Sequence, residues 1–474
     1  MPPATTDNQP RGLRVIFRAL SHRNFKLFFS GQIISLVGKW MQMVARAWLV
    51  YRLTGSAVLL GAVGFAGQVP VFLLSPLGGA VADRHSRHRI VIATQTASMI
   101  FTLILAGLTL AGVVRIWHIM TIAALLGIVN AFDVPARQAF YVELVGRDDL
   151  LNAIALNSSM VNFARVVGPA LAGLVIAAIG EGWCFFADGV SYIAVIAGLL
   201  LMRLEPFQRP THKPSAISQI MEGFRFVART PPIRALLLML GLASLVGMPY
   251  AVLMPIFAED ILHSGARGLG LLMGAAGVGA LLGALTLAGK RNVKGLGRWV
   301  ALAAMGFGLA LIAFTFSRHF LLSMLLLVPV GFAMMLQMAS SNTLIQTMVP
   351  DQLRGRVMSV YSMMFMGMAP FGALLSGAVA HRMGAPHTVA IGGAIVVVGA
   401  LVFYSQLPAL RVQARRLIVA QEAAGGDPAN EATGGAATVE EELQGSGGRV
   451  QGSGITENRE QEAGSRKQET GTAL

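Results

Sequence analysis

The chain has 474 residues, of which 54% are hydrophobic and only 13% are charged. About a quarter of the residues in a soluble domain are charged, so this composition excludes an ordinary soluble protein. The formal net charge of +14 would suggest nucleic-acid binding in a soluble protein, but a membrane protein acquires such an excess from its cytoplasmic loops. We therefore expect the lipid bilayer as a partner and no nucleic acid.

The N-terminal segment, 1–24, is basic and lacks the isolated apolar core and cleavage site of a secretory signal peptide. After it, apolar runs long enough to cross a bilayer as helices recur along the chain. Runs of this length favour helices over the short alternating strands of a barrel. The sequence thus predicts an all-α membrane fold of twelve transmembrane helices: 25–50, 56–81, 90–113, 117–137, 152–179, 183–202, 234–258, 267–289, 299–317, 320–347, 357–380 and 387–407.

These helices divide the chain into a cytoplasmic N-terminal segment (1–24), a six-helix bundle (25–202), a polar central linker (203–233), a second six-helix bundle (234–410) and a tail (411–474). The linker contains a candidate amphipathic helix on the cytoplasmic surface, with Ile217, Ile220, Met221, Phe224 and Val227 at helical spacing. The tail is rich in Gly, Glu and Gln, which predicts disorder.

The distribution of Lys and Arg predicts the orientation. If both termini are cytoplasmic, the outer loops hold only five of the 37 Lys and Arg residues: Arg52, Arg115, Arg267, Arg318 and Arg382. Such an asymmetry is typical of an even number of spans with both ends inside. We expect a multi-pass protein of the bacterial inner membrane.

The two halves of the sequence resemble each other. Gly79-Ala80, after the second span, corresponds to Gly283-Ala284 after the eighth. The segment 145–150 before the fifth span corresponds, at nearly the same offset, to 349–353 before the eleventh. Two agreeing offsets indicate two six-helix halves of parallel topology, an arrangement known from secondary transporters.

Few residues suggest enzymatic chemistry. The single cysteine, Cys184, excludes an intramolecular disulfide. The nine histidines include no HExxH-type pair inside an apolar run, which argues against a membrane metalloenzyme. The nearest match to a phosphate-binding loop, GALTLAGKR at 283–291, has the wrong spacing and no Ser or Thr after Lys290. We expect no catalytic residue, no metal, no cofactor and no nucleotide site.

The segment 78–89 reads GGAVADRHSRHR and resembles the signature Gly-x-x-x-Asp-Arg-x-Gly-Arg-(Arg/Lys) of the major facilitator superfamily. Four residues match it, and Ser86 replaces the second glycine: Gly79, Asp83, Arg84 and Arg87. The resemblance implies a cytoplasmic latch between the halves, in which Asp83 faces the start of the eleventh helix at Arg354 and Arg356. The alternative is a basic cap that follows the positive-inside rule.

Other stretches narrow the family. The segments GQIISLVGKWMQMVARAWLVYRLTGS, AFDVPARQAF, ELVGRDDLLNAIALNS and ARVVGPALAG resemble the enterobactin-exporter-like and macrolide-efflux branch, over roughly 21–408. This branch is often grouped with drug–proton antiporters, so the resemblance implies secondary transport driven by protons. Lys39 departs from the small polar or acidic residue expected there.

One face of the first helix is polar along its length, with spacings of three and four residues: Gln32, Ser35, Lys39, Gln42 and Arg46. A cation at the bilayer centre that faced lipid would cost about 2.5–3.5 kcal/mol. The pattern therefore predicts that this face and the adjacent Trp40 line a water-filled cavity, with Gln337 of the tenth span. Two alternatives remain, namely that Arg46 reaches the interface and that Lys39 pairs with Asp188.

Several other polar residues lie within or beside the spans. Asp188 is an acid well inside an apolar run and a candidate for proton coupling, with a structural partner role as the alternative. Glu259 and Asp260 close the seventh span and are candidates for proton entry, a gate or a solvated helix end. Asp133 and Arg137 are one helical turn apart and are expected to form an ion pair that organises a cytoplasmic gate. Arg165, before Gly168-Pro169, is expected to serve close helix packing, although a direct role remains open.

Taken together, the sequence predicts a monomeric, proton-coupled exporter of an amphipathic small molecule, such as a siderophore or drug, working by alternating access. Import of a small anionic nutrient is the main alternative. An integral membrane enzyme would need a cluster of His or paired acids at one depth, which the sequence does not contain.

Overall fold

The computed structural model describes residues 17–146, 148–204, 216–290 and 295–423. These residues belong to one compact unit, Met1–Pro428. Within them, twelve helices are long and apolar enough to cross a membrane, and no strand is present. The predicted all-α fold with twelve transmembrane helices is therefore confirmed.

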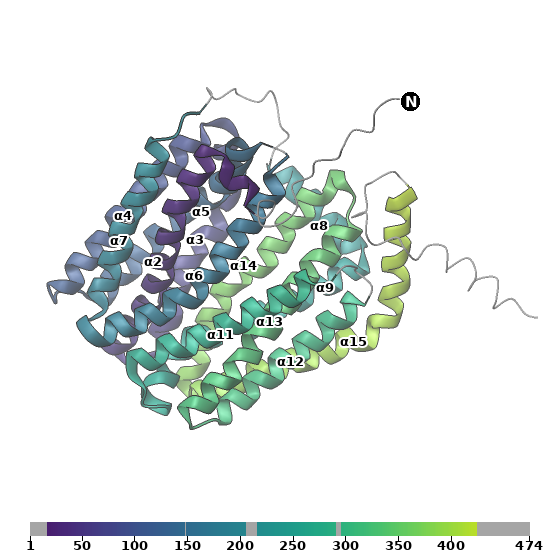
Figure 1. The fold of residues 1–474 in the computed structure, drawn as a ribbon. Helices are drawn as coiled ribbons and strands as arrows, with labels where there is room; N and C mark the ends of the chain where they lie inside the picture. Colours follow the sequence, from purple (N-terminus) through teal and green to yellow (C-terminus); the bar gives the residue numbers. More distant parts are fainter. Residues whose placement is uncertain (1–16, 147, 205–215, 291–294, 424–474) are drawn as a thin grey trace, which may run out of the picture. The chain divides into compact units, whose positions relative to one another are not determined.

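The first half follows a short 3-10 helix, η1 (Arg18–Ser21), and contains six long helices (Figure 1). They are α2 (Arg23–Thr54), α3 (Ala57–Arg84), α4 (Arg87–Leu110), α5 (Ile116–Val145), α6 (Leu150–Ile179) and α7 (Glu181–Leu200). The connections are short because glycines end the helices: Gly55 after α2 has φ 58° and Gly180 after α6 has φ 94°, conformations that favour glycine.

The second half begins after α8 (Ala216–Arg229) with the broken seventh span, Pro231–Ile261. This span consists of α9 (Pro231–Leu242), the π-helical turn η2 (Ala243–Gly247), α10 (Tyr250–Ile256) and the π-helical turn η3 (Phe257–Ile261). The remaining spans are α11 (Gly265–Ala288), α12 (Leu296–Phe316), α13 (Phe320–Met348), α14 (Asp351–Met383) and α15 (Ala385–Ala423). Extra residues in π-helical turns widen the helix locally and often occur at functional positions.

The same packing pattern occurs in both halves. In the first half α3 packs against α5, α2 against α6 and α7, and α4 against α5 and α7. In the second half α11 packs against α13, α9 against α14 and α15, and α12 against α13 and α15. The correspondence follows chain order, so the structure has two pseudo-symmetric six-helix bundles, as the internal repeat predicts.

The two bundles meet along two helix pairs, α3 with α14 and α6 with α11, which we call the seam. Glycines form the closest contacts there. A Cβ at Gly61 of α3 would lie 2.4 Å from the Ala373 carbonyl oxygen of α14. A Cβ at Gly270 of α11 would lie 2.8 Å from the Cα of Gly173 of α6. Small residues allow such close backbone approach between membrane helices.

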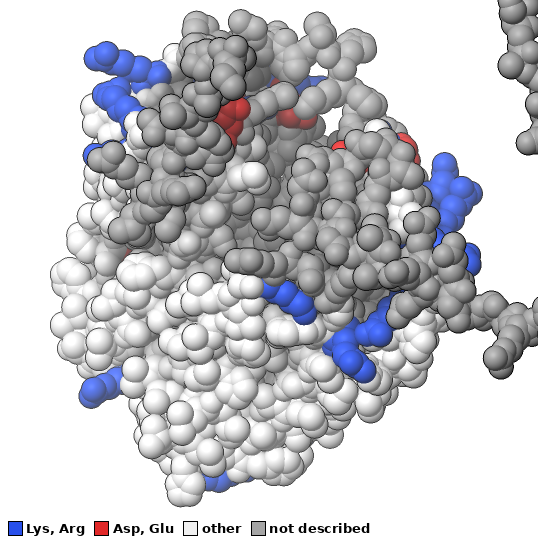
Figure 2. All heavy atoms as spheres, turned by 45° about the vertical axis from the view of Figure 1, so that its right-hand side comes forward, with Lys and Arg blue, Asp and Glu red and all other residues white. Residues whose placement is uncertain are grey.

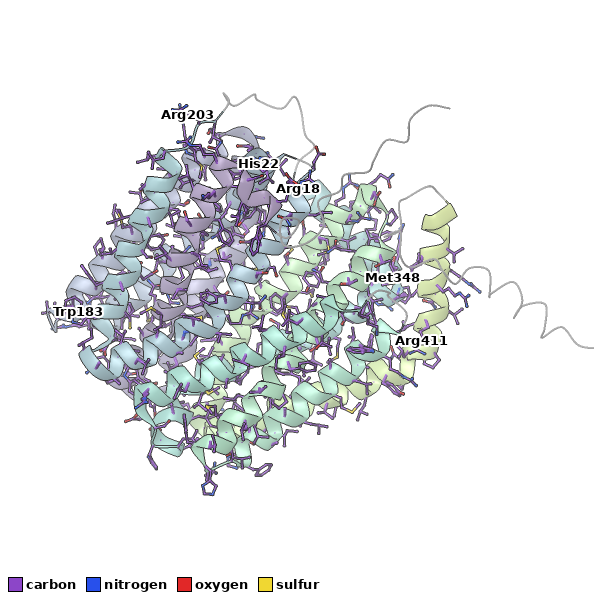
Figure 3. All side chains as sticks on the ribbon, in the orientation of Figure 1. Arg18, His22, Trp183, Arg203, Met348 and Arg411 are labelled. Carbon is purple, nitrogen blue, oxygen red and sulfur yellow. The ribbon has the colours of Figure 1, made fainter. Side chains whose placement is uncertain are left out.

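The surface agrees with a membrane location. Figure 2 shows a face whose lower part carries few charged side chains, and large apolar side chains such as Leu73 and Leu325 are exposed. Figure 3 places Arg18, His22 and Arg203 at one end of the first bundle and Trp183 at the other. We call the end with Arg18 and Arg203 the basic end and the other the opposite end.

The described helices extend beyond several predicted spans, for example α5, which continues to Val145 instead of ending at 137. Two of the differences concern the predicted linker and tail. α9 begins at Pro231, inside the segment assigned to the linker, because proline is well tolerated at the first turn of a helix. α15 continues to Ala423, past the boundary placed at 411, because Arg411–Ala423 contains mostly helix-forming residues and no Gly or Pro. Of the linker and the tail, residues 205–215 and 424–474 lie outside the described residues.

Tight packing at the seam yields a first prediction. Gly270→Val should lower the thermal unfolding midpoint of the protein in detergent, because the added atoms overlap the Pro169 and Gly173 backbones at a cost of about 1–3 kcal/mol. Gly107→Val on α4 is the matched control, since no atom lies within 4 Å of a Cβ there. Equal midpoints for the two variants would contradict the seam described here.

Candidate functional site

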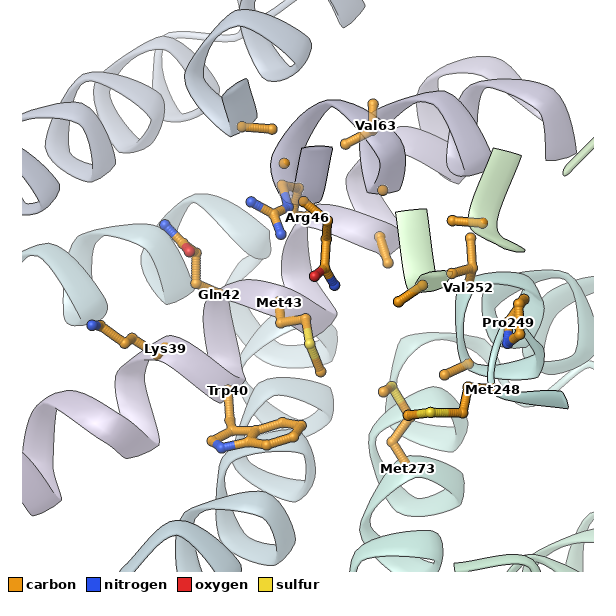
Figure 4. A pocket seen from close by; sticks show the side chains of 18 of the residues that line it. Lys39, Trp40, Gln42, Met43, Arg46, Val63, Met248, Pro249, Val252 and Met273 are labelled. Carbon is orange, nitrogen blue, oxygen red and sulfur yellow. The ribbon is translucent and has the colours of Figure 1, made fainter. Parts of the chain in front are cut away.

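A cavity of about 630 Å³ lies between the two bundles (Figure 4). Side chains from both halves line it, with a large share from α2 and from the broken seventh span. The lining includes six methionines, which are polarizable and adaptable side chains: Met43, Met248, Met254, Met273, Met334 and Met366. The cavity volume falls within the range typical of sites for small organic molecules.

The charged side chains that line the cavity are all cations. They are Lys39 and Arg46 of α2 and Arg165 of α6. Among the described lining residues no Asp or Glu is present, and the other polar groups are neutral, including Gln42, Asn130 and Tyr192. The electrostatic potential of the cavity is therefore positive, which favours negatively charged groups.

The structure places four of the predicted cavity residues, Lys39, Trp40, Gln42 and Arg46, on the wall. In Figure 4 the Trp40 ring and Met43 extend toward the side with Met248 and Met273, whereas Lys39 extends the other way. The Lys39 ammonium lies 5.4 Å from the centroid of the Tyr192 ring of α7. Lys39 thus borders both the cavity and the interior of the first bundle.

Three other residues of that prediction lie elsewhere. Gln32 and Ser35 are buried between helices of the first bundle, because α2 is longer than the cavity and its first turns pack on α7, where Gly31 meets Ala194. Gln337 is only 2% exposed, and its amide nitrogen lies 3.5 Å from the Met239 carbonyl oxygen. None of the three lines the cavity in the part of the chain that the structure describes.

The predicted ion pair at the fourth span is present. Arg137 Nη2 lies 3.3 Å from Asp133 Oδ2, one helical turn away on α5. Thr94 and Gln95 of α4 donate hydrogen bonds of 2.9 and 2.8 Å to Asp133 Oδ1. Nearby, Gln42 donates to Thr102 of α4 over 3.0 Å. The ion pair is therefore part of a polar cluster that joins α4 and α5, and a separate hydrogen bond joins α2 to α4.

Asp188 of α7 is completely buried. Neither of its carboxylate oxygens has a hydrogen-bond partner among the described residues. A Cβ at Gly38 of α2 would lie 2.7 Å from Oδ1, so the carboxyl group is held against the backbone of α2. The cations that act on it electrostatically are Lys39 and Arg46. A buried carboxylate without hydrogen bonds is costly, and protonation removes most of that cost.

At the basic end, the signature loop makes contacts within the first bundle. Arg87 Nη1 lies 2.7 Å from Glu143 Oε1 of α5. Asp83 is partly buried and Arg84 is exposed. A Cβ at Gly78 would lie 2.1 Å from the Ala131 carbonyl oxygen, whereas Gly79, the signature position, has open space around it.

Arg354 and Arg356, the residues expected to face Asp83 in the latch, each form an ion pair with another acid. Arg354 pairs with Asp351 in the first turn of α14, over 2.5 Å. Arg356 pairs with Glu222 of α8. These two ion pairs join residues of α14 to each other and to α8, and neither of them crosses between the bundles.

At the opposite end, contacts outside and within the seam hold the two bundles together. The Tyr51 hydroxyl of α2 donates a hydrogen bond to Asp260 of η3, and Glu259 and Asp260 are both exposed. Gly61 lies near the start of α3 and Gly173 near the end of α6, so their contacts with α14 and α11 are also near this end. The seam is therefore closed at the opposite end.

Arg165, for which the sequence favoured a packing role and left a direct role open, is also a residue of the cavity wall. Its guanidinium group lies 5.5 Å from the centroid of the Trp40 ring. An arginine in the middle of an apolar run, with no acid one turn away, is the signal that would have found it. Among the described residues, no group of three His, Cys, Asp or Glu side chains is placed to hold a metal ion.

Two repeated six-helix bundles with a cavity at their seam define a membrane transporter of the major facilitator type. The chain belongs to the transmembrane secretion effector family, whose model matches residues 15–422. It is 28% identical over 384 residues to the staphyloferrin A transporter of Staphylococcus aureus, covering 80% of this chain and 95% of that protein. It is also 28% identical over 384 residues to the multidrug efflux pump Tap of Mycolicibacterium fortuitum, covering 79% and 93%.

A third relative is the enterobactin exporter EntS of Escherichia coli, 27% identical over 389 residues, with 80% of this chain and 91% of that protein covered. Among solved structures, a peptide transporter POT mutant in complex with sulfate superposes with a TM-score of 0.68 at 12% identity, covering 85% of this chain and 97% of that one. This likeness concerns the fold alone. The family and these relatives are transporters, so the protein is a multi-pass membrane transporter of small molecules and not an enzyme.

The buried ion pair yields a second prediction. Arg137→Met alone should lower the thermal unfolding midpoint in detergent strongly, because an unpaired Asp133 carboxylate is left among buried groups, a loss of about 3–5 kcal/mol. The double variant Asp133→Leu, Arg137→Met should recover most of that loss, because both charges are then absent. If the double variant were less stable than the single one, the pair would not be the structural unit described here.

Proposed function

We propose that the protein is a secondary active exporter that moves an amphipathic small molecule out of the cell by alternating access. The observation that carries this proposal is the seam cavity of about 630 Å³, enclosed by two pseudo-symmetric bundles that contact each other at the opposite end. In such a fold, rocking of the bundles about the seam exposes a central site to each side of the membrane in turn. The described state is then the one open at the basic end.

The cargo in this proposal is a siderophore or a drug-like compound. The cavity supports both a polar and an apolar contact surface, since three cations and several amides share the wall with six methionines. Relatives named for staphyloferrin A, enterobactin and multidrug transport support the same class of cargo. Adaptable methionine surfaces suit ligands of varied shape.

The basic end is proposed to face the cytoplasm of a bacterial cell, with the membrane being the inner one and both termini inside. Arg84, Arg87 and Arg203 lie at this end, and excess positive charge marks the cytoplasmic side. The signature loop with Asp83, together with the Asp133–Arg137 pair, is then placed to act as the cytoplasmic gate.

The orientation yields a third prediction. A membrane-impermeant maleimide added to intact spheroplasts should label the Val113→Cys variant, because Val113 is exposed in the opposite-end turn after α4. It should label the His85→Cys variant only after permeabilisation, because His85 follows α3 at the basic end. The native Cys184 is buried and gives little background. Labelling of His85→Cys alone in intact spheroplasts would reverse the orientation and make the described state open to the outside.

Proton coupling is proposed to use Asp188. Of the three acids that the sequence singles out, Glu259 and Asp260 are exposed at the opposite end, and Asp260 already accepts a hydrogen bond from Tyr51. Asp188 is buried beside the cavity cations without a hydrogen bond among the described residues. Its charge state therefore changes the potential of the cavity more than that of either exposed acid.

A fourth prediction tests the driving force. Cargo efflux from proteoliposomes should accelerate when a pH gradient is imposed on the wild-type protein, because proton influx drives the cycle. The Asp188→Asn variant should transport at the same rate with and without that gradient, whereas Glu259→Gln should keep the acceleration. Equal rates in the wild type would eliminate proton coupling.

The second candidate function is import of a small anionic nutrient. The observation in its favour is the set of three cations on the wall, with no acid among the described lining residues. Direction separates the two functions, since cells that overproduce an exporter become resistant to a toxic cargo, while cells that overproduce an importer accumulate it.

A further inference from the structure

Arg165 is a partly buried cation, and no acid among the described residues forms an ion pair with it. Its Nε and Nη1 atoms are shielded from solvent and have no hydrogen-bond partner among the described residues. The other cations of the wall, Lys39 and Arg46, both lie in the electrostatic field of Asp188, whereas no acid in the described part of the chain acts on Arg165 in this way. Unsatisfied donors of a buried guanidinium are costly, so this group has an unused capacity to bind an anion.

The local sequence fixes the position of this group. A Cβ at Gly168 of α6 would lie 2.4 Å from the Cβ of Trp40, so glycine at this position allows α6 to approach α2. One turn earlier on α6, the Arg165 guanidinium lies 5.5 Å from the centroid of the Trp40 ring. On the other side, a Cβ at Gly277 of α11 would lie 2.8 Å from the Arg165 carbonyl oxygen. Arg165 is therefore held between the two bundles with little freedom to move away.

The surroundings define the chemistry of a ligand that would bind to Arg165. A guanidinium forms strong, charge-assisted N–H···O hydrogen bonds with a carboxylate. The neighbouring Trp40 ring and the methionines of the wall, such as Met43 and Met273, offer a surface for a flat apolar group. Tyr250 of α10 also lines the cavity.

We propose that Arg165 and Trp40 form an anchoring site for a cargo that carries a carboxylate on an aromatic ring. Arg165 binds the carboxylate and Trp40 stacks on the ring. Lys39 and Arg46 also line the cavity and attract the anion, but both lie in the field of Asp188, whereas Arg165 does not. This inference rests on the proposed transport function and names its class of cargo.

Equilibrium binding to the purified full-length protein in detergent tests the site. Three probes are titrated by calorimetry: 2-naphthoate, its neutral analogue 2-naphthamide, and acetate. The wild type should bind 2-naphthoate at least about tenfold more tightly than either other probe, because only 2-naphthoate offers both charge and ring. Equal affinity for 2-naphthoate and 2-naphthamide would overturn the anion site. Equal affinity for 2-naphthoate and acetate would overturn the role of Trp40.

Variants separate the anchor from general damage to the protein. Arg165→Gln should weaken 2-naphthoate binding by about ten- to hundredfold while changing 2-naphthamide binding little, since a hydrogen-bonded charge pair contributes a difference of this size. Trp40→Leu should weaken both aromatic probes and leave acetate unchanged. Arg165→Lys keeps the charge without the planar fork and should fall between wild type and Arg165→Gln. An equal loss of both aromatic probes in Arg165→Gln would refute the anchor.

The matched control is Arg382→Gln, at the opposite end of α14 and outside the cavity, which should bind all three probes as the wild type does. Because binding is measured without a gradient, its outcome is independent of the efflux assay. Selective binding without efflux would contradict the proposed export function and support the anchoring site. Efflux without selective binding would contradict the anchoring site and support the export function.

Discussion

A charge inside a membrane must be neutralised, hydrated or bound, and this constraint decides how the first bundle is organised. Arg137 meets the requirement with Asp133, which two hydrogen bonds from α4 hold in place. Lys39 meets it partly through the Tyr192 ring and the field of Asp133 and Asp188. Arg165 has neither an acid nor a hydrogen bond among the described residues. The cost of leaving that cation unpaired makes the cavity a site for an anion rather than a packing defect.

The seam that creates the cavity also positions its charged groups. Glycines at the α3–α14 and α6–α11 contacts bring the backbones of the two bundles close together at the opposite end. Gly168 and Gly277 also lack side chains, so α6 lies close to α2 and to α11, and Arg165 is held between them. A bulkier residue at either position would move the guanidinium group as well as the helix. Packing and ligand recognition are therefore not separable functions of the Gly168-Pro169 segment, although sequence reasoning treated them as alternatives.

Sequence reasoning predicted features that depend on periodicity and composition, and it failed where depth along a helix matters. Hydropathy gave the twelve spans, and the repeat of Gly79 and Gly283 predicted two halves. The polar stripe of α2 identified a face but not its extent, so Gln32 and Ser35 lie between helices while Lys39 and Arg46 reach the cavity. Helical spacing carries no information on which turns a neighbouring helix covers. The sequence also could not tell which glycine of the Gly78-Gly79 pair is packed. The structure shows that it is Gly78, which lies against Ala131.

The sign of the cavity charge bears on the energy source. Moving one negative charge outward through an inside-negative membrane is favourable by about 2.3 kcal/mol per 100 mV. In the proposed cycle a proton enters as an anionic cargo leaves, so two charges move in the favourable direction and the potential contributes about twice that amount. Loss of the proton carried by Asp188 removes one of these charges and leaves the other. Because the positive cavity, and Arg165 in particular, favours an anionic cargo, the membrane potential itself drives export of that cargo. Proton influx then adds a second contribution to the driving force.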